Sequence, residues 1–165
     1  MTYRICPLAL ERQDRDSFSC GVAALDRYFR ETVSQDIRRR VATCFVALDE
    51  HGRLAGFYTL AATSVLLTDL PAAVAKKLPR YPLVPAVRMG RLAVQTEHHG
   101  RGLGAALLAD ALERSMGLEV GAFALVVDSK DEHASAFYQH HGFLSLPGQP
   151  RSLFLPLASA KAALR

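Results

Sequence analysis

The stretch that decides the fold reads Arg91-Leu92-Ala93-Val94-Gln95-Thr96-Glu97-His98-His99-Gly100-Arg101-Gly102-Leu103-Gly104-Ala105-Ala106-Leu107-Leu108. An apolar strand ends at Val94, three alternating glycines follow, and a helix with an apolar face begins near Gly102. Glycine lets successive backbone N–H groups point into one concavity, and a helix N-terminus adds partial positive charge there. Arg101 brings a full charge to the same turn. The segment therefore predicts a cradle for a pyrophosphate.

This segment has three alternative interpretations: a Walker P-loop, a dinucleotide-binding fingerprint and a plain structural turn. A Walker P-loop requires Gly-Lys-Ser/Thr after the loop, and Gly104-Ala105-Ala106 does not supply it. The dinucleotide fingerprint matches formally at Gly100-x-Gly102-x-x-Ala105, with Asp128 at the end of the next strand. However, about 90 residues with a hairpin precede the turn, whereas doubly wound dinucleotide folds usually start at it. A plain turn would not need so many glycines.

Hydrophobic periodicity outlines an α/β chain with a mixed sheet. Apolar alternation and short apolar runs predict strands over 3–8, 43–48, 54–60, 87–94, 123–127, 143–146 and 153–157. Apolar spacings of three and four predict helices over 22–40, 72–77, 102–116 and 131–141. Three prolines precede the fourth strand: Pro79, Pro82 and Pro85. Because no repeat or linker interrupts this order, we expect residues 1–165 to form a single domain.

The composition excludes several classes of protein. Half of the residues are apolar (50%) and 22% are charged, which is typical of a globular chain. No run approaches the ~18–20 apolar residues of a membrane span, and the N-terminus lacks the apolar core of a signal peptide. The cysteines number 3 and include no Cys-x-x-Cys pair, so we expect no disulfide framework and no metal. A reducing cytoplasm fits best.

The positive charge of the chain is unevenly spread. Lys and Arg number 20 against 16 Asp and Glu, a formal charge of +4. No acidic residue lies between Asp69 and Glu97, whereas several lysines and arginines do. This asymmetry indicates a polyanionic partner or ligand, with a merely solvated basic face as the alternative.

The glycine turn resembles motif A of the GNAT (Gcn5-related N-acetyltransferase) superfamily, whose loop reads Gln/Arg-x-x-Gly-x-Gly/Ala. His99-Gly100-Arg101-Gly102-Leu103-Gly104 fills it, with His99 departing from the usual first residue. The resemblance implies an α/β GNAT fold: a mostly antiparallel sheet of about six or seven strands, flanking helices and a parallel splayed pair at the acetyl-CoA site. It implies that backbone 92–94 pairs with pantetheine and residues 101–105 hold pyrophosphate. The residues it assigns to the coenzyme are Leu92, Ala93, Val94, His99, Gly100, Arg101, Gly102, Leu103, Gly104, Ala105 and Phe137.

A second motif, Ala134-Ser135-Ala136-Phe137-Tyr138-Gln139-His140-His141-Gly142-Phe143, fits the GNAT motif B pattern Ala-x-x-Phe-Tyr-x-x-x-Gly-Phe. When an amine attacks a thioester, the leaving thiolate needs a proton, and a phenol with a pKa of about 10 can donate one at neutral pH. In the family this tyrosine sits beside the coenzyme sulfur, so the resemblance makes Tyr138 the catalytic acid. The alternative is that Phe137 and Tyr138 are helix-packing aromatics. No general base stands out; Glu97, His98 and Tyr58 are conceivable helpers.

A narrower resemblance covers the chain from end to end. Phe18-Ser19-Cys20-Gly21, Gly56-Phe57-Tyr58, Gly90-Arg91-Leu92-Ala93-Val94 and Leu153-Phe154-Leu155-Pro156-Leu157 look like motifs of the TacT-type toxins of bacterial toxin–antitoxin systems. This implies acetylation of the α-amine of aminoacyl-tRNA, a homodimer and a ribbon-helix-helix antitoxin. Since Arg and Lys bind phosphates, the residues expected to contact tRNA are Arg38, Arg39, Arg40, Lys76, Lys77, Arg80, Arg88 and Arg91.

Two other functions remain compatible with the sequence. A GNAT enzyme can act on a small amine or a protein N-terminus, although an acidic pocket would suit a cationic acceptor better than the acid-free stretch does. A non-catalytic acyl-CoA-binding module could share the fold, but it would not need Tyr138.

Overall fold

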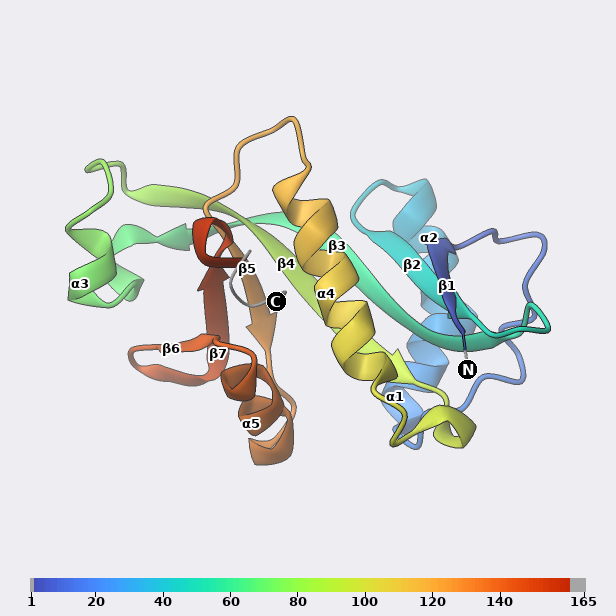
Figure 1. Ribbon diagram of the computed structural model, residues 1–165. Helices are drawn as coiled ribbons and strands as arrows, with labels where there is room; N and C mark the ends of the chain where they lie inside the picture. Colours follow the sequence, from blue (N-terminus) through green and yellow to red (C-terminus); the bar gives the residue numbers. More distant parts are fainter. Residues whose placement is uncertain (1, 161–165) are drawn as a thin grey trace. The chain divides into compact units, whose positions relative to one another are not determined.

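The computed structural model describes residues 2–160 (Figure 1). Hydrogen bonding places seven strands in one sheet with the order β1-β2-β3-β4-β5-β7-β6. Contacts divide the described residues into two compact units: unit 1 contains those up to Ala61 and Gly90–Ala111, and unit 2 contains Ala62–Met89 and those from Leu112 on. The mixed, mostly antiparallel sheet confirms the predicted α/β fold class.

Unit 1 begins with antiparallel strands. Strand β1 (Arg4–Pro7) pairs with β2 (Thr43–Leu48), which pairs with β3 (Leu54–Leu66). The turn between β2 and β3 is closed by the Asp49 carboxylate, whose Oδ1 accepts from the backbone N–H groups of His51 at 2.8 Å and Arg53 at 3.0 Å. This is the hairpin predicted from the sequence, although β3 continues six residues past the predicted end at Leu60.

The first long helix is interrupted by a π-helical segment. The apolar spacing predicts one helix over 22–40, whereas the chain forms α1 (Ala23–Arg27), the π-helix η1 (Tyr28–Thr32) and α2 (Val33–Arg38). The wider turn buries two consecutive aromatic residues, Tyr28 and Phe29. The Phe29 carbonyl accepts from the Arg15 guanidinium at 2.9 Å, which supports the widened turn from outside the helix. Past α2, Arg40 adopts the left-handed region with φ of 60°.

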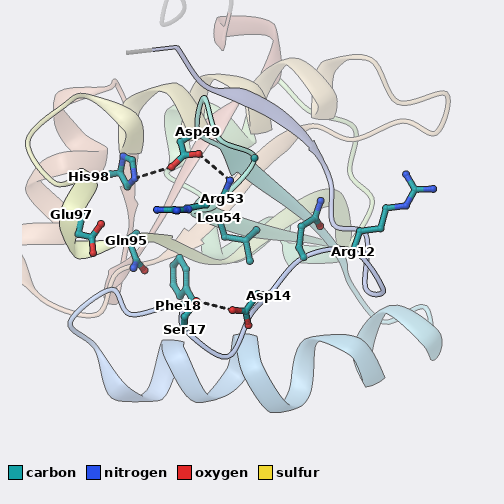
Figure 2. A pocket seen from close by; sticks show the side chains of 12 residues that line it. Arg12, Asp14, Ser17, Phe18, Asp49, Arg53, Leu54, Gln95, Glu97 and His98 are labelled. Carbon is teal, nitrogen blue, oxygen red and sulfur yellow. Dashed lines mark hydrogen bonds and ion pairs between the residues drawn. The ribbon is translucent and has the colours of Figure 1, made fainter.

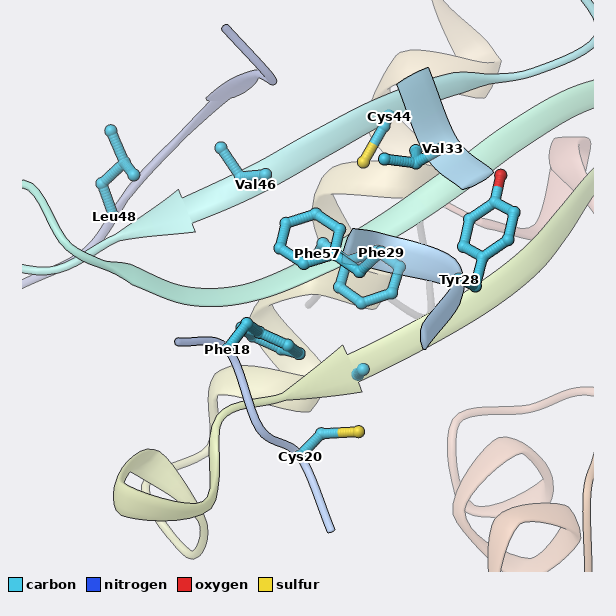
Figure 3. Close-up of a cluster of buried hydrophobic side chains, with 10 residues drawn as sticks. Phe18, Cys20, Tyr28, Phe29, Val33, Cys44, Val46, Leu48 and Phe57 are labelled. Carbon is cyan, nitrogen blue, oxygen red and sulfur yellow. The ribbon is translucent and has the colours of Figure 1, made fainter. Parts of the chain in front are cut away.

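Aromatic rings form the core of unit 1 (Figure 3). Phe29 and Phe57 stack with centroids 4.2 Å apart, and Phe18 meets both edge-on at 4.9 and 5.5 Å. Cys20 and Cys44 belong to the same cluster. Burial raises the pKa of the Cys44 thiol to about 12, so this cysteine packs as a small apolar residue.

Unit 2 contains the parallel strand pair. Residues Ala86–Met89 of β4 (Leu83–Val94) pair in parallel with Ala124–Val127 of β5 (Ala124–Asp128). Strand β5 then pairs antiparallel with β7 (Gln149–Pro156), whose other neighbour is β6 (Leu144–Leu146). The remaining elements are η2 (Leu67–Asp69), α3 (Ala72–Ala75), α5 (Glu132–His140) and η4 (Leu157–Ser159).

Strand β4 begins earlier than the prolines suggest. The sequence predicts its start at Val87, but the strand includes Pro85. Proline lacks a backbone N–H, yet its carbonyl can still accept, and that of Pro85 accepts from the Phe123 N–H at 2.8 Å. The proline therefore remains compatible with sheet pairing on that side.

Helix α4 (Leu103–Met116) follows the short η3 (Thr96–His98) and matches the predicted helix closely. Leu103, Leu107 and Ala111 are buried along its apolar face. In unit 1 this face approaches β3 at Gly56, where a Cβ would lie 2.9 Å from the Ala93 carbonyl and 3.0 Å from a Leu107 methyl. Gly56 therefore permits the close approach. No helix in the described part of the chain has the length and hydrophobicity required to span a bilayer.

Candidate active site

The glycine turn lies in unit 1 between β4 and α4. Gly100 and Gly102 both have φ of 77°, a left-handed conformation that glycine adopts without strain. A Cβ built on either would meet nothing within 4 Å, so space lies open beside the backbone. The turn leads directly into a helix of 14 residues, whose N-terminus favours an anion. Arg101 is exposed at the same place.

His99, the residue that departs from the GNAT pattern, has a defined position. Its Nε2 lies 2.7 Å from the carbonyl oxygen of Val94, so Nε2 carries the proton and donates it. The bond closes the turn from the end of β4 to the first glycine. Sequence reasoning assigned His99 to the coenzyme site but did not foresee this backbone partner.

The end of β4 extends beyond its parallel partner. Pairing with β5 covers Ala86 to Met89, so in the described chain Gly90–Val94 lies outside that ladder. This segment contains the backbone that the family resemblance assigns to pantetheine, Leu92–Val94. A strand edge of this kind offers N–H and C=O groups to an extended ligand.

Tyr138 lies in unit 2, on α5. Its side chain is buried (7% exposed), and burial raises the pKa of the phenol to about 12. The ring contacts Phe137 and Phe143 with centroids 5.2 and 5.5 Å apart. Among the described residues its hydroxyl has no hydrogen-bond partner. The hydroxyl oxygen is not completely shielded from solvent, unlike Ser115 Oγ, which is both fully buried and unpaired. The phenol is thus protonated at neutral pH and available to donate.

Both ends of α5 are fixed by local contacts. At the start, the Asp131 carboxylate accepts from the Ala134 N–H at 2.8 Å and so caps the helix, at the position where the sequence predicts its beginning. At the end, the Tyr138 carbonyl accepts from the N–H groups of His141 at 3.0 Å and Phe143 at 3.1 Å, and Gly142 turns the chain with φ of 93°. Burial, with a smaller contribution from His140, lowers the pKa of His141. These bonds position Tyr138 on a short, well-anchored helix.

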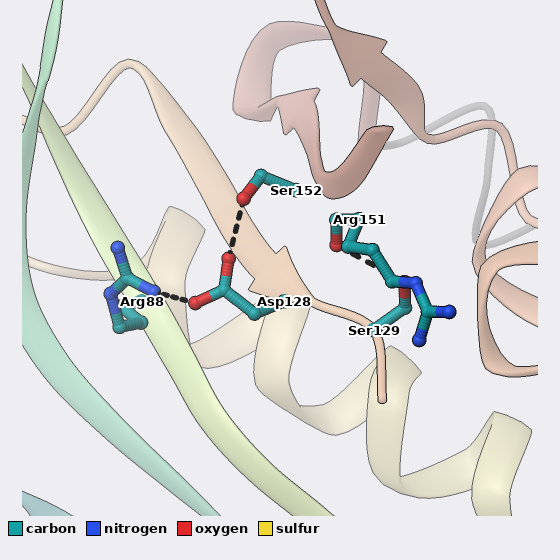
Figure 4. A network of polar contacts seen from close by, with 5 residues as sticks. All are labelled: Arg88, Asp128, Ser129, Arg151 and Ser152. Atoms are coloured by element: carbon teal, nitrogen blue, oxygen red, sulfur yellow. Dashed lines mark hydrogen bonds and ion pairs between the residues drawn. The ribbon is translucent and has the colours of Figure 1, made fainter. Parts of the chain in front are cut away.

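A polar network holds the end of β5 in unit 2 (Figure 4). The Arg88 guanidinium pairs with Asp128, and Ser152 Oγ donates to the other carboxylate oxygen at 2.7 Å. Ser129 is buried and bonds both to Ser135 Oγ at 2.5 Å and to the Arg151 carbonyl at 3.1 Å. The network fixes the loop that precedes α5. No local sequence pattern indicates this network, because its residues come from three separate strands, a loop and α5.

The basic residues expected to contact RNA fall into two groups that differ in their surroundings. Arg88 is paired with Asp128, and the Arg91 guanidinium stacks 3.5 Å above the Tyr28 ring, whose hydroxyl donates to Asp36 at 2.7 Å. Both arginines have a structural partner. Within residues 2–160 no ion pair is formed by the other predicted contacts, all of which are exposed: Arg38, Arg39, Arg40, Lys76, Lys77 and Arg80.

Unit 1 also contains a polar cavity that the sequence did not reveal (Figure 2). Its volume is about 560 Å³, and it is lined by segments around Arg12–Phe18, Asp49–Leu54 and Gln95–His98. His98 is buried there between the Tyr3 hydroxyl, 2.8 Å from Nδ1, and Asp49, 3.8 Å from Nε2. Burial tends to raise the pKa of Asp49, but the N–H bonds from Arg53 and His51 outweigh it and lower the pKa.

The three residues that the sequence suggested as candidates to assist a general base have the following surroundings. Tyr58 is fully buried, stacks on Phe45 and donates to Asp110 at 2.5 Å, which indicates a packing role. His98 is held by Tyr3 and Asp49 as described above. Glu97 is exposed at the rim of the cavity.

Comparison with known proteins connects both motifs to one family. The family described as "Acetyltransferase (GNAT) domain" matches residues 40–144, which include the glycine turn and α5. A tRNA-acetylating toxin of Mycobacterium tuberculosis is 36% identical over 156 residues, covering 93% of this chain and 92% of the relative.

Solved structures of similar proteins extend over the same length. A tyrosine-to-phenylalanine mutant of KacT matches with a TM-score of 0.91 and 29% identity, covering 98% of this chain and 99% of KacT. AtaT complexed with acetyl-methionyl-tRNAfMet matches with a TM-score of 0.89 and 28% identity, covering 99% of this chain and 100% of AtaT. On the family match and the toxin relative, the chain belongs to the GNAT family of acetyltransferases.

Proposed function

We propose that the protein is an acetyl-CoA-dependent N-acetyltransferase that acetylates the α-amine of aminoacyl-tRNA and thereby blocks translation. The observation that carries this proposal is the end-to-end similarity to a tRNA-acetylating toxin, combined with an intact glycine turn and an available Tyr138 phenol. An N-acetylated aminoacyl group has no free amine with which to form a peptide bond.

The donor half of the site consists of unit 1 residues. Backbone N–H groups of Gly100–Ala105 and the start of α4 suit the pyrophosphate of acetyl-CoA, because they combine open space with partial positive charge. The edge of β4 at Leu92–Val94 suits the amide groups of pantetheine. The similar protein AtaT has been solved with acetyl-CoA bound, which supports this choice of donor.

The chemical step requires one proton donor. The neutral α-amine attacks the thioester carbonyl, a C–N bond forms, and the C–S bond breaks as the tetrahedral intermediate collapses. The Tyr138 hydroxyl donates its proton to the departing thiolate, the amine loses a proton to water, and the tyrosinate regains a proton from the solvent. Because the pKa of Tyr138 is about 12, this acid stays protonated throughout the physiological pH range. An α-amine with a pKa of about 7.7–8.0 is already partly neutral, so a strong general base is not required.

The acceptor half depends on the exposed cations. Arg38 ends α2 in unit 1 and Arg39 and Arg40 follow it, whereas Lys76, Lys77 and Arg80 follow α3 in unit 2. These charges suit RNA phosphates, which supply most of the sequence-independent affinity. Arg88 and Arg91 belong to the same predicted set, although each also has a partner within the fold.

The partners follow from the same family. AtaT has been solved with the C-terminus of the antitoxin AtaR, and we propose that a ribbon-helix-helix antitoxin neutralises this protein. We also propose that it acts as a homodimer in the cytoplasm, where its RNA substrate is found.

The decisive experiment is incubation of the purified protein with radiolabelled acetyl-CoA and total charged tRNA. We expect label on the aminoacyl group, released as N-acetyl amino acid after mild alkaline hydrolysis. Uncharged tRNA is the control and should remain unlabelled, because it offers no α-amine. Label confined to small amines or protein N-termini would reject the tRNA substrate but retain the acetyltransferase, and a protein that binds acetyl-CoA without any transfer would be a binding module.

A further inference from the structure

The connection between β3 and β4 in unit 2 is a folded segment that contains α3 (Figure 1). The Leu67 N–H donates to the Pro82 carbonyl at 3.0 Å, which closes the connection at its base. Inside it, α3 and the following turn are hydrogen-bonded from Pro71 to Leu78. Leu70 is 5% exposed and, with Val74 and Leu78, packs on the core of unit 2. The backbone that carries the outward side chains is therefore held in place.

Those outward side chains are one aromatic ring and several cations. Tyr81 is 70% exposed, and Leu66 and Leu83 beside the closing bond are 48% and 55% exposed. The chain has five tyrosines, all of them within the described residues, and Tyr81 is the one that is exposed rather than buried or half-buried. Lys76, Lys77 and Arg80 are exposed in the same connection.

The surroundings favour a polyanion over a protein partner. From Leu70 to Thr96 the sequence has no acidic residue, and Asp69, at the start of the connection, lies 3.4 Å from the Gln149 amide that donates to it. Tyrosine and arginine are enriched in protein–protein interfaces but lysine is depleted there, so the two lysines and the lack of acidic neighbours favour a polyanion over a second copy of the chain. Proteins that bind single-stranded nucleic acid combine basic grooves with aromatic rings on which bases stack.

We propose that Tyr81 is a stacking platform for an unpaired base of the RNA substrate, with Lys76, Lys77 and Arg80 on the adjoining phosphates. The proposal rests on aminoacyl-tRNA being the acceptor, and it adds a specific contact to the unpaired 3′ end that carries the amino acid. Tyr81 acts by positioning the RNA and takes no part in the chemical step.

The test measures binding of the full-length protein to fluorescently labelled, uncharged tRNA transcripts. Tyr81→Ala removes the ring, Tyr81→Phe keeps it, and Val120→Ala removes another exposed side chain of unit 2 (79% exposed) as the matched control. We expect Tyr81→Ala to weaken binding by about 5- to 150-fold, because stacking on an aromatic ring contributes that much per base. Tyr81→Phe and Val120→Ala should stay within about twofold of the wild type.

Two further measurements identify the contact. On a transcript that lacks the unpaired 3′ nucleotides, wild type and Tyr81→Ala should bind equally. Lys77→Gln should reduce the slope of log affinity against log salt by about 1, whereas Tyr81→Ala should leave that slope unchanged. Circular dichroism and acetyl-CoA affinity check that each variant is folded.

Several outcomes would overturn the proposal. One is equal affinity of wild type and Tyr81→Ala for full-length tRNA. Another is that Tyr81→Ala lowers the affinity for the truncated transcript as much as it lowers the affinity for full-length tRNA. A third is that Tyr81→Ala lowers the oligomeric state in sedimentation and binds RNA normally, which would assign the ring to a second copy. If wild type acetylates aminoacyl-tRNA but Tyr81→Ala has an unchanged KM for it, only this inference fails. If wild type acetylates no aminoacyl-tRNA, the proposed function fails instead.

Discussion

At the scale of single residues, the proposed chemistry depends on keeping one phenol neutral. Tyr138 is buried among Phe137 and Phe143, with no hydrogen-bond partner in the described chain to stabilise its phenolate. Desolvation therefore disfavours the charged form and raises the pKa to about 12. Because this pKa lies far above neutral pH, the phenol is protonated before the reaction begins, and its O–H can donate a hydrogen bond to the sulfur as negative charge develops there.

Tyr138→Phe tests this role with little change in shape. The variant keeps the ring in its aromatic surroundings, so we expect normal acetyl-CoA affinity and a kcat reduced by about 10²- to 10⁴-fold, the usual contribution of a general acid. Calorimetry measures the first and release of free CoA the second. Tyr3→Phe is the control, since it also removes one hydroxyl, the one bonded to His98, and should retain activity. Transfer by Tyr138→Phe at the wild-type rate would show that another group supplies the proton.

At the scale of elements, we propose that the glycine turn and the helix that follows it bind the coenzyme. Gly102→Asp places bulk and negative charge in the open space beside the turn, so we expect acetyl-CoA affinity to fall by at least about 100-fold, as juxtaposed like charges cost several kcal/mol. Gly148→Asp is a matched control, because Gly148 has φ of 76° and the same open surroundings, and it shares any backbone strain. Calorimetry with acetyl-CoA measures both. Normal affinity in Gly102→Asp would remove this turn from the coenzyme site.

The contact between β3 and α4 gives a second prediction at this scale. A Cβ at Gly56 would lie 2.9 Å from the backbone oxygen of Ala93, which cannot move aside as a side chain could. We therefore expect Gly56→Ala to lower the free energy of unfolding by about 1–3 kcal/mol, the usual cost of overpacking. Gly121→Ala, at a glycine whose Cβ would meet nothing within 4 Å, should change it by less than about 1 kcal/mol. Urea denaturation distinguishes them, and equal stability would contradict the close approach.

The elements also show what a sequence can reveal. Local patterns predicted the β2–β3 hairpin, α4 and the start of α5, because their signals lie within a few residues of one another. The π-helical turn at Tyr28–Thr32 was missed, since a helical period over five residues does not distinguish it from an α-turn. The strand through Pro85 was missed because proline affects donation and leaves acceptance intact. The Arg88–Asp128 pair and the His98 cavity join segments far apart in sequence, where no local pattern could reveal them.

At the scale of the whole molecule, three buried groups make the free energy of unfolding depend on pH in the alkaline range. Burial is the main cause that raises the pKa of Cys44 from its ordinary 9.0 to about 12, of Tyr138 from 10.0 to about 12, and of Tyr28 in the same direction. In the unfolded chain these groups ionise at a lower pH than in the folded protein, where they keep their protons. The unfolded state then binds fewer protons, so the free energy of unfolding decreases as the pH rises from 9 towards 12.

We expect each group to contribute a slope of up to about 1.4 kcal/mol per pH unit above its ordinary pKa. Urea denaturation at several pH values between 8 and 10.5 measures this slope. Cys44→Val should flatten it just above pH 9, whatever its effect on stability at neutral pH. An unchanged slope in Cys44→Val would mean that the thiol ionises equally in the folded and unfolded protein.

The part of β4 beyond its pairing with β5 has a consequence for how the protein behaves in solution. Gly90–Val94 lies outside the β4–β5 ladder, and an uncovered strand edge is a template on which other chains can add and aggregate. A coenzyme lying along that edge would act as a cap as well as a substrate. Saturating acetyl-CoA should therefore suppress aggregation on heating and raise the Tm, as any ligand of the folded state does, and CoA without its acetyl group should do the same.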